Sequence, residues 1–172
     1  DHIRIQVLCA GFALEKAYKT ADAIETELEK KLTFAFDKDL GYLTECPTNL
    51  GTGMRASVML HLPALEAANG IEALSRAVAK IGLTLRGTYG EGSGAAGSLY
   101  QLSNQITLGI DEKSAIENLS AVTKQVMDKE LEARKTVGRD NLEDMVYRSL
   151  GILKSARMLS GAELSKHLSN LR

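Results

Sequence analysis

The sequence is poor in several kinds of residue, and each scarcity argues against a class of protein. Its 172 residues include two cysteines, Cys9 and Cys46, which are too few for a disulfide framework and favour a reducing, cytoplasmic setting. Tryptophan is absent, and 21 Lys plus Arg balance 22 Asp plus Glu, so nothing indicates binding to nucleic acid. No apolar run approaches the roughly 20 residues of a membrane-spanning helix. The histidines, His2, His61 and His167, are scattered and no CxxC pair accompanies them, so no metal site is predicted.

Hydrophobic periodicity predicts an α+β fold, with an antiparallel β-sheet flanked by α-helices. The predicted strands are 2–9, 55–62, 83–87 and part of 98–109. The predicted helices are 12–31, one that begins at Pro63 and carries apolar residues to Ile81, one capped by Asp111, 141–157, and a short last helix with a Ser160–Glu163 capping box. The chain is divided into residues 1–135 and a helical extension, 136–172.

Three arginines are placed alike on the predicted strands. Arg4, Arg55 and Arg86 each lie on the polar face of a strand. If these strands are neighbours, three guanidinium groups converge, and a polyphosphate would balance their charge. An antiparallel sheet often has one solvated face, however, so the three arginines could equally be ordinary surface charges.

The segment CPTNLGTG, residues 46–53, surrounds one of the two cysteines. A lone cysteine is most often a small buried hydrophobe. Here the Thr48 hydroxyl, the backbone N–H groups of the turn and the nearby Arg55 could each stabilise a thiolate. The pattern therefore permits a reactive or charged Cys46 without requiring one.

The glycine-rich segment TYGEGSGAAG, residues 88–97, formally contains GxGxxG after a predicted strand. A dinucleotide site needs a helix after these glycines, but SLYQLSNQITLG follows and is typical of a strand and a turn. We therefore reject the dinucleotide interpretation. The segment suits a loop that closes over a substrate and brings the carboxylate of Glu91 to it, or else a simple surface turn.

Together these segments resemble one known family. CPTNLGTGMRASVMLHLP at 46–63 resembles the active-site cysteine motif of the ATP:guanidino phosphotransferases, the phosphagen kinases. DHIRI at 1–5, RGTYGEG at 86–92 and SNQITLG at 103–109 resemble further motifs of that family, in its order. Creatine and arginine kinases have a histidine where this chain has Met59. The amino-acid residues of these motifs are more similar to those of the bacterial protein-arginine kinases.

The resemblance implies a role for each matching residue. Residues 1–135 would be the family's C-terminal catalytic lobe, with Cys46 as a tuned thiolate and Glu91 as a carboxylate that orients the guanidinium. ATP or ADP would be bound with Mg²⁺ held mainly through the nucleotide. The implied nucleotide-binding residues are Arg4, Arg55, Ala56, Ser57, Val58, Met59, Arg86, Gly87, Thr88, Tyr89, Gly90 and Glu91.

The activity implied is transfer of the γ-phosphoryl group of ATP to arginine side chains of proteins. Implied partners are arginine-containing protein substrates, a stress-response repressor and Clp-type protease machinery of protein quality control. Met145, Leu150 and Met158, in the helices after residue 135, would either bind a second copy of the chain or be buried locally. Two alternatives stay open at this point. One is a metabolic phosphagen kinase acting on a free guanidino compound, and the other is a non-catalytic module that binds nucleotide or phosphoarginine.

The sequence also departs from the family pattern. It begins at Asp1, where the family's catalytic glutamate would just precede it, and Gly94 stands where an acidic residue is expected. The phosphoarginine-docking motif RDxxRA does not occur, since Arg139-Asp140 is followed by Asn-Leu-Glu-Asp. We therefore expect the chain to be one lobe of a longer protein and to be inactive alone.

Overall fold

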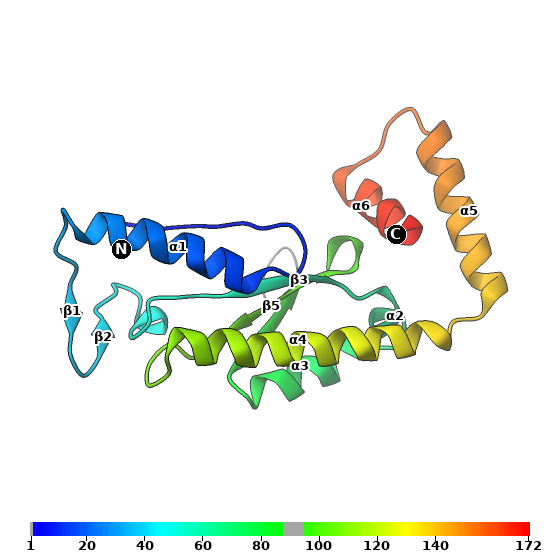
Figure 1. The fold of residues 1–172 in the computed structure, drawn as a ribbon. Helices are drawn as coiled ribbons and strands as arrows, with labels where there is room; N and C mark the ends of the chain where they lie inside the picture. The colour runs from blue at the N-terminus through cyan, green and yellow to red at the C-terminus, as the bar shows by residue number, and fades with distance from the viewer. Residues whose placement is uncertain (1, 88–94) are drawn as a thin grey trace. The chain divides into compact units, whose positions relative to one another are not determined.

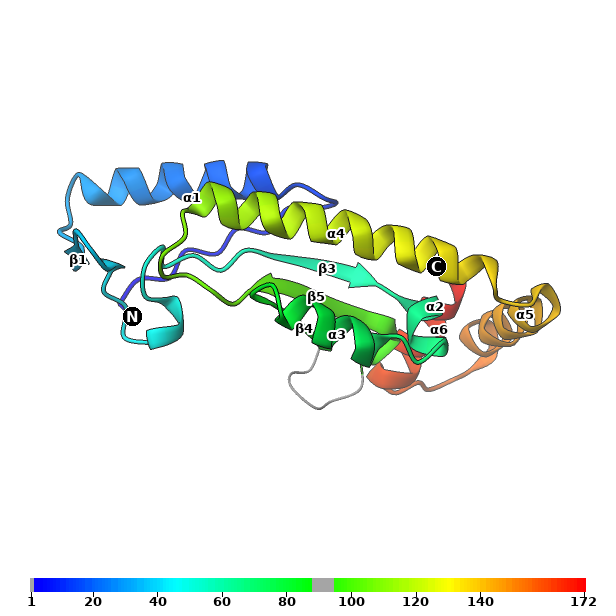
Figure 2. The same ribbon diagram turned by 90° about the horizontal axis from the view of Figure 1, so that it is seen from below.

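The computed structural model describes residues 2–87 and 95–172, whose helices and strands are drawn in Figures 1 and 2. These residues form two compact units. The first unit contains residues 1–58 and 103–122, and the second contains 59–102 and 123–172. The elements are α1 (Leu14–Glu29), β1 (Phe36–Asp37), β2 (Gly41–Tyr42), η1 (Pro47–Asn49), β3 (Ser57–His61), α2 (Pro63–Ala67), α3 (Ile71–Ala79), β4 (Leu83–Gly87), η2 (Ala96–Ser98), β5 (Leu99–Asn104), α4 (Glu112–Lys135), α5 (Arg139–Ser155) and α6 (Gly161–Leu171).

The predicted α+β class with antiparallel strands is confirmed. Strands β1 and β2 pair antiparallel, and a second sheet has the strand order β3-β5-β4. Backbone hydrogen bonds join Asn104 to Ala56 and Leu62 to Ser98, so β5 runs antiparallel to β3. Strand β5 therefore lies between β3 and β4, which are not direct neighbours. Within the described residues, each helix is too short or too polar to cross a bilayer.

The strand predicted at residues 2–9 is wrong. These residues alternate in sequence, but the described part, from His2 onward, forms no ladder with another segment. A strand needs a neighbour for its backbone N–H and C=O groups, and alternation alone does not supply one. Leu8 is almost fully exposed as a result.

The first unit contains α1 and the β1–β2 hairpin. Helix α1 confirms the helix predicted at 12–31, although none of its side chains is fully buried. The hairpin was not predicted, because its strands are only two residues long. The Tyr42 hydroxyl donates a hydrogen bond to Glu25 of α1 at 2.6 Å, and this bond raises the pKa of Tyr42. The hairpin is thereby attached to the helix that precedes it.

The helix predicted from Pro63 to Ile81 is two helices. Pro63 begins α2 as predicted, but the helix ends at Ala67 and α3 begins at Ile71. Between them Asn69 adopts a left-handed φ of 55°, and Gly70 N–H bonds to Leu65 C=O. Asparagine tolerates this conformation better than most residues, and it turns the chain between the two helices.

The remaining helices confirm the predicted pattern. The Asp111 side chain accepts a hydrogen bond from Ser114 N–H at the start of α4, and Ser160 accepts one from Glu163 N–H at the start of α6. In the second unit the buried apolar side chains come from the strands and the residue after β3, and from α2, α3 and α4. They are Leu60, Leu62, Ala64, Leu74, Val78, Leu83, Leu85, Tyr100, Leu102 and Val126.

A buried carboxylate joins α4 to α2. Glu130 is 4% exposed, and its two oxygens accept hydrogen bonds from the N–H groups of Ala64 and Leu65 at 3.0 and 2.9 Å. These N–H groups are at the start of α2, where a helix has no internal partner for them and favours a negative charge. Arg134, one turn along α4, adds an ion pair at 2.8 Å. Glu130 is thus fully paired although it is buried.

Replacing this carboxylate is expected to destabilise the second unit. Glu130→Ala leaves two N–H groups of α2 and the Arg134 guanidinium without their acceptor, so we expect a loss of about 3 kcal/mol in the free energy of unfolding. Urea unfolding followed by circular dichroism measures it. Glu132→Ala removes an exposed carboxylate from the same helix and should change stability by less than about 0.5 kcal/mol. Equal effects of the two changes would contradict the role given to Glu130.

Candidate active site

The loop that carries Cys46 is closed by a backbone bridge. Tyr42 and Gly51 exchange two backbone hydrogen bonds, of 2.8 and 3.3 Å, on either side of the loop. Inside the loop Cys46 is the N-cap of η1, with Pro47 at its first position, and Thr44 donates a hydrogen bond to the Cys46 carbonyl. These local contacts fix the backbone at Cys46.

Thr107, which follows β5, anchors the same loop from outside. Its side chain is buried, and its hydroxyl lies 3.0 Å from the Thr48 carbonyl and 2.8 Å from the Leu50 carbonyl, donating toward both. Its own carbonyl accepts the N–H of Thr52 at 3.0 Å. Gly51 has a φ of 107°, and a Cβ there would overlap the Thr107 carbonyl oxygen. Only glycine at this position lets the two backbones come so close.

Asn104, at the end of β5, anchors the residues around Arg55. It is 4% exposed, its Oδ1 accepts the Ala56 N–H at 2.7 Å, and its Nδ2 donates to the carbonyls of Met54 and Ile106. We did not predict roles for Asn104 and Thr107 individually. The signal for them was their place in the SNQITLG motif, whose contacts are long-range and cannot be read from periodicity.

Cys46 is an exposed cysteine and not a small buried hydrophobe. Its Sγ lies 3.0 Å from Thr48 Oγ1. The pKa of the Cys46 thiol is below its usual value, mainly because the side chain and the backbone N–H of Thr48 form hydrogen bonds with the sulfur. The charge of Arg55 lowers the pKa further, while Glu45 opposes the shift. The loop thus favours a thiolate beside a guanidinium group.

Arg55 lies just before β3 on the exposed face of the strand. The predicted alternation is confirmed, because Arg55, Ser57 and Met59 are exposed while Leu60 and Leu62 are buried. The Arg55 guanidinium donates to Ser103 Oγ at 3.4 Å. It forms no ion pair with a carboxylate among residues 2–87 and 95–172. An exposed guanidinium of this kind suits an anionic ligand.

The structure brings together only part of the predicted site. Cys46, Thr48 and Arg55 interact within the first unit. Arg4 is exposed in the same unit, in the segment before α1. Arg86 is half-buried on β4 in the second unit. The convergence of the three arginines therefore stays a prediction.

The other predicted nucleotide-binding residues have these places. Ala56 precedes β3, Ser57, Val58 and Met59 lie in it, and Gly87 ends β4. Thr88, Tyr89, Gly90 and Glu91 lie outside the described residues.

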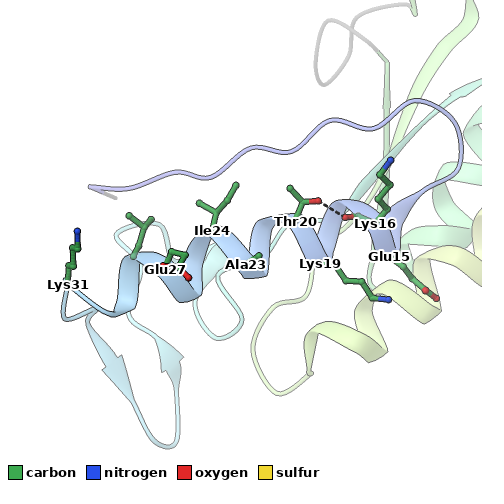
Figure 3. Close-up of a pocket in the computed structure, with 9 residues that line it drawn as sticks. Glu15, Lys16, Lys19, Thr20, Ala23, Ile24, Glu27 and Lys31 are labelled. Carbon is green, nitrogen blue, oxygen red and sulfur yellow. Dashed lines mark hydrogen bonds between the residues drawn. The ribbon is translucent and has the colours of Figure 1, made fainter.

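A hollow of about 1090 Å³ lies elsewhere, along α1 (Figure 3). Its lining comes from α1 and from Lys31 just after it, and includes none of the predicted site residues. The lining residues are Glu15, Lys16, Lys19, Thr20, Ala23, Ile24, Glu27, Leu28 and Lys31. Among the described residues, no cluster of three or more His, Cys, Asp or Glu side chains could hold a metal ion.

The reactivity of Cys46 tests the thiolate. In a Cys9→Ser background, Thr48→Val removes the hydroxyl beside Sγ and should raise the pKa of Cys46, because the thiolate loses a hydrogen bond. The rate of Cys46 alkylation by iodoacetamide should then fall at pH 7 to 8 but stay unchanged well above the pKa of the thiol. The dependence of this rate on pH gives the shift in the pKa of Cys46. Thr52→Val, in the same loop, removes a hydroxyl that accepts from Met54 N–H and should leave the profile unchanged. An unchanged profile for Thr48→Val would exclude this cause.

The close approach of Gly51 to Thr107 gives a second prediction. Gly51→Ala should destabilise the first unit by more than Gly11→Ala. Both glycines have a positive φ, which costs an alanine about 1 kcal/mol, but a Cβ at Gly11 meets nothing within 4 Å. Thermal unfolding of the two variants measures the difference. Equal losses of stability in the two variants would show that the loop moves to make room for the Cβ at position 51.

Comparison with known proteins agrees with this geometry. Residues 1–133 match the family model of the ATP:guanido phosphotransferase C-terminal catalytic domain, and residues 139–172 match that of the protein-arginine kinase McsB C-terminal domain. Over its whole length the chain is 49%, 50% and 47% identical to proteins named protein-arginine kinase from Clostridium kluyveri, Halothermothrix orenii and Bacillus subtilis. It covers 51%, 50% and 48% of these proteins, about half their length.

Two solved structures are similar at 31% identity. The duplicated taurocyamine kinase from Schistosoma mansoni, with bound transition state analog components, has a TM-score of 0.61 over 80% of this chain and 20% of that one. A lombricine kinase has a TM-score of 0.58 over 74% of this chain and 34% of that one. The structural likeness and the family match over most of the chain lead to one conclusion. The chain belongs to the family of ATP:guanido phosphotransferase C-terminal catalytic domains.

Proposed function

We propose that this chain is the catalytic lobe of a protein-arginine kinase, which transfers the γ-phosphoryl group of ATP to arginine side chains of proteins. The relatives that are 47–50% identical over its whole length are named for that activity, and residues 139–172 match a domain of the same enzymes. The observation that carries the proposal is the thiolate-favouring Cys46 beside the exposed Arg55.

This pair suits phosphoryl transfer to a guanidino group. Such a transfer depends on alignment and on neutralising the charge of the phosphates, with little covalent help from the protein. Arg55 offers a cation for phosphate oxygens, and we propose that Arg4 and Arg86 offer two more. The Cys46 thiolate places a negative charge where a cationic guanidinium would lie. In this proposal the negative Cys46 attracts the cationic acceptor, and the positive Arg55 attracts the anionic nucleotide.

In the proposed reaction a guanidino nitrogen of the acceptor attacks the γ-phosphorus and loses a proton to solvent. The new P–N bond replaces the P–O bond to ADP, which leaves. We propose that Glu91 orients the guanidinium and that residues 55–59 and 86–91 contact ATP or ADP. Mg²⁺, held mainly through the nucleotide, would neutralise phosphate charge.

We also propose the organisation and partners that the resemblance implies. Residues 1–135 form the catalytic lobe and 136–172 a helical extension. Arginine-containing proteins are the substrates, in a cytoplasmic stress response and protein quality control. A stress-response repressor, Clp-type protease machinery and a second copy of the chain are the proposed partners.

The direct test is ATP-dependent formation of phosphoarginine in the full-length protein, with an arginine-rich protein as acceptor and mass spectrometry under non-acidic conditions. Arg55→Ala should lower kcat/KM about a hundredfold, because a phosphate-binding cation is lost. Glu91→Gln should also lower it. Arg76→Ala is the matched control, since Arg76 is an exposed arginine of α3 paired with Glu72.

Three other outcomes would count against the proposal. Phosphorylation of free arginine or another guanidino compound, without protein phosphoarginine, would show a metabolic phosphagen kinase. Nucleotide binding without transfer to any acceptor would show a regulatory module. Equal activity of the Arg55→Ala and Arg76→Ala variants would remove Arg55 from the site.

A further inference from the structure

The last helix, α6, is fixed to α5 by a buried polar cluster. Ser149 of α5 is 2% exposed, and its hydroxyl accepts a hydrogen bond from Asn170 Nδ2 at 2.9 Å and lies 3.2 Å from His167 Nδ1. Both partners are on α6, and His167 is itself buried. Buried polar groups with satisfied hydrogen bonds define one arrangement of the helices they join. The position of α6 on α5 is therefore specific.

Helix α6 also lies against η2, the short turn that leads into β5. Gly97 in η2 has a φ of 63°, and a Cβ there would lie 2.6 Å from the carbonyl oxygen of Ser165 in α6. The two backbones are thus in direct contact. The Ser98 carbonyl accepts a hydrogen bond from Leu62 N–H at 2.9 Å, just after β3. The turn is consequently held from two sides.

The backbone of η2 needs this support. Ser98, which is not glycine, has a φ of 54° directly after the positive φ of Gly97. A left-handed conformation at a residue with a Cβ is costly and persists only where the surroundings hold it. The surroundings here are α6 and the residue after β3. Without α6, η2 would lose one of these two supports.

A second contact joins α6 to the end of β3. His61 Nε2 lies 2.7 Å from Ser169 Oγ, and His61 is half-buried. Burial lowers the pKa of His61, and the charges of Arg172 and Arg134 lower it further against the opposing carboxylates of Glu130 and Glu66, which favours the neutral imidazole. The contact is a hydrogen bond whose donor depends on the tautomer of the imidazole.

We propose that α6 is a positioning element for phosphoryl transfer. Through Ser165 and Ser169 it holds η2 and the end of β3, two segments that are continuous in the chain with the site. Strand β3 begins two residues after Arg55, and η2 leads into β5, which ends at the anchoring residue Asn104. The inference rests on the function proposed above. It makes the helical extension a part of the catalytic machinery and not an appendage to it.

The experiment is a double-mutant cycle on phosphoarginine formation by the full-length protein. Ser169→Ala and His61→Ala should each lower kcat several-fold, up to about tenfold, with the KM for ATP changed less. The double variant should lose no more than either single one, because one hydrogen bond is removed in all three. Ser169→Thr keeps the hydroxyl and should restore kcat.

Ser160→Ala is the matched control. It removes the N-cap hydrogen bond at the start of the same helix. Ser160 precedes Ser165 and Ser169, the residues of α6 that contact η2 and His61. The substitution should lower the melting temperature while leaving kcat per folded molecule unchanged. Equal loss of kcat in Ser160→Ala and Ser169→Ala, or purely additive losses in the cycle, would overturn the inference.

Failure of the proposed function is distinguishable from failure of this inference. If the wild-type protein forms no phosphoarginine, the function is wrong. Hydrogen exchange over residues 59–62 and 96–104 of the same proteins then tests whether α6 holds the end of β3 and η2. Faster exchange in Ser169→Ala than in Ser160→Ala supports the positioning by α6. Equal exchange contradicts it.

Discussion

The site depends on the close approach of Gly51 to Thr107. One buried hydroxyl faces two carbonyls of the Cys46 loop, and a glycine without a side chain lets the two backbones meet. Three residues earlier, Asn104 holds the chain on both sides of Arg55. A single short segment, 104–107, therefore anchors both the thiol and the guanidinium. Neither group would have a defined position if that segment moved.

This arrangement explains how the pKa of an exposed cysteine is lowered without a low-dielectric pocket. The sulfur is stabilised by hydrogen bonds from its own loop, first from Thr48, and only secondarily by the charge of Arg55. Hydrogen bonds inside a rigid loop are less sensitive to salt than the attraction between exposed charges. The loop thus lowers the pKa of Cys46 before any ligand arrives. Such preorganisation is what electrostatic catalysis requires.

Local patterns in the sequence predicted much of this fold. Helices α1, α4, α5 and α6 and strands β3, β4 and β5 follow from periodicity and capping, because these signals act over a few residues. The strand at 2–9 failed because pairing needs a partner that alternation does not reveal. The helix after Pro63 was predicted too long, because the spacing of its apolar residues continues through the turn at Asn69–Gly70 that ends α2. In the site, Cys46 and Arg55 were identified from sequence, whereas the anchors Asn104 and Thr107 act across about 50 residues of chain and were not.

The central claim is that Cys46 and Arg55 belong to one site that binds nucleotide and guanidino acceptor together. Protection of Cys46 tests it most directly, by measuring its alkylation in full-length protein carrying Cys9→Ser, with and without Mg·ADP and an arginine-containing peptide. The account predicts that the two ligands together slow alkylation of Cys46 and that Arg55→Ala abolishes this protection. Alkylation at the same rate with and without the ligands, in a protein that binds Mg·ADP, would contradict it.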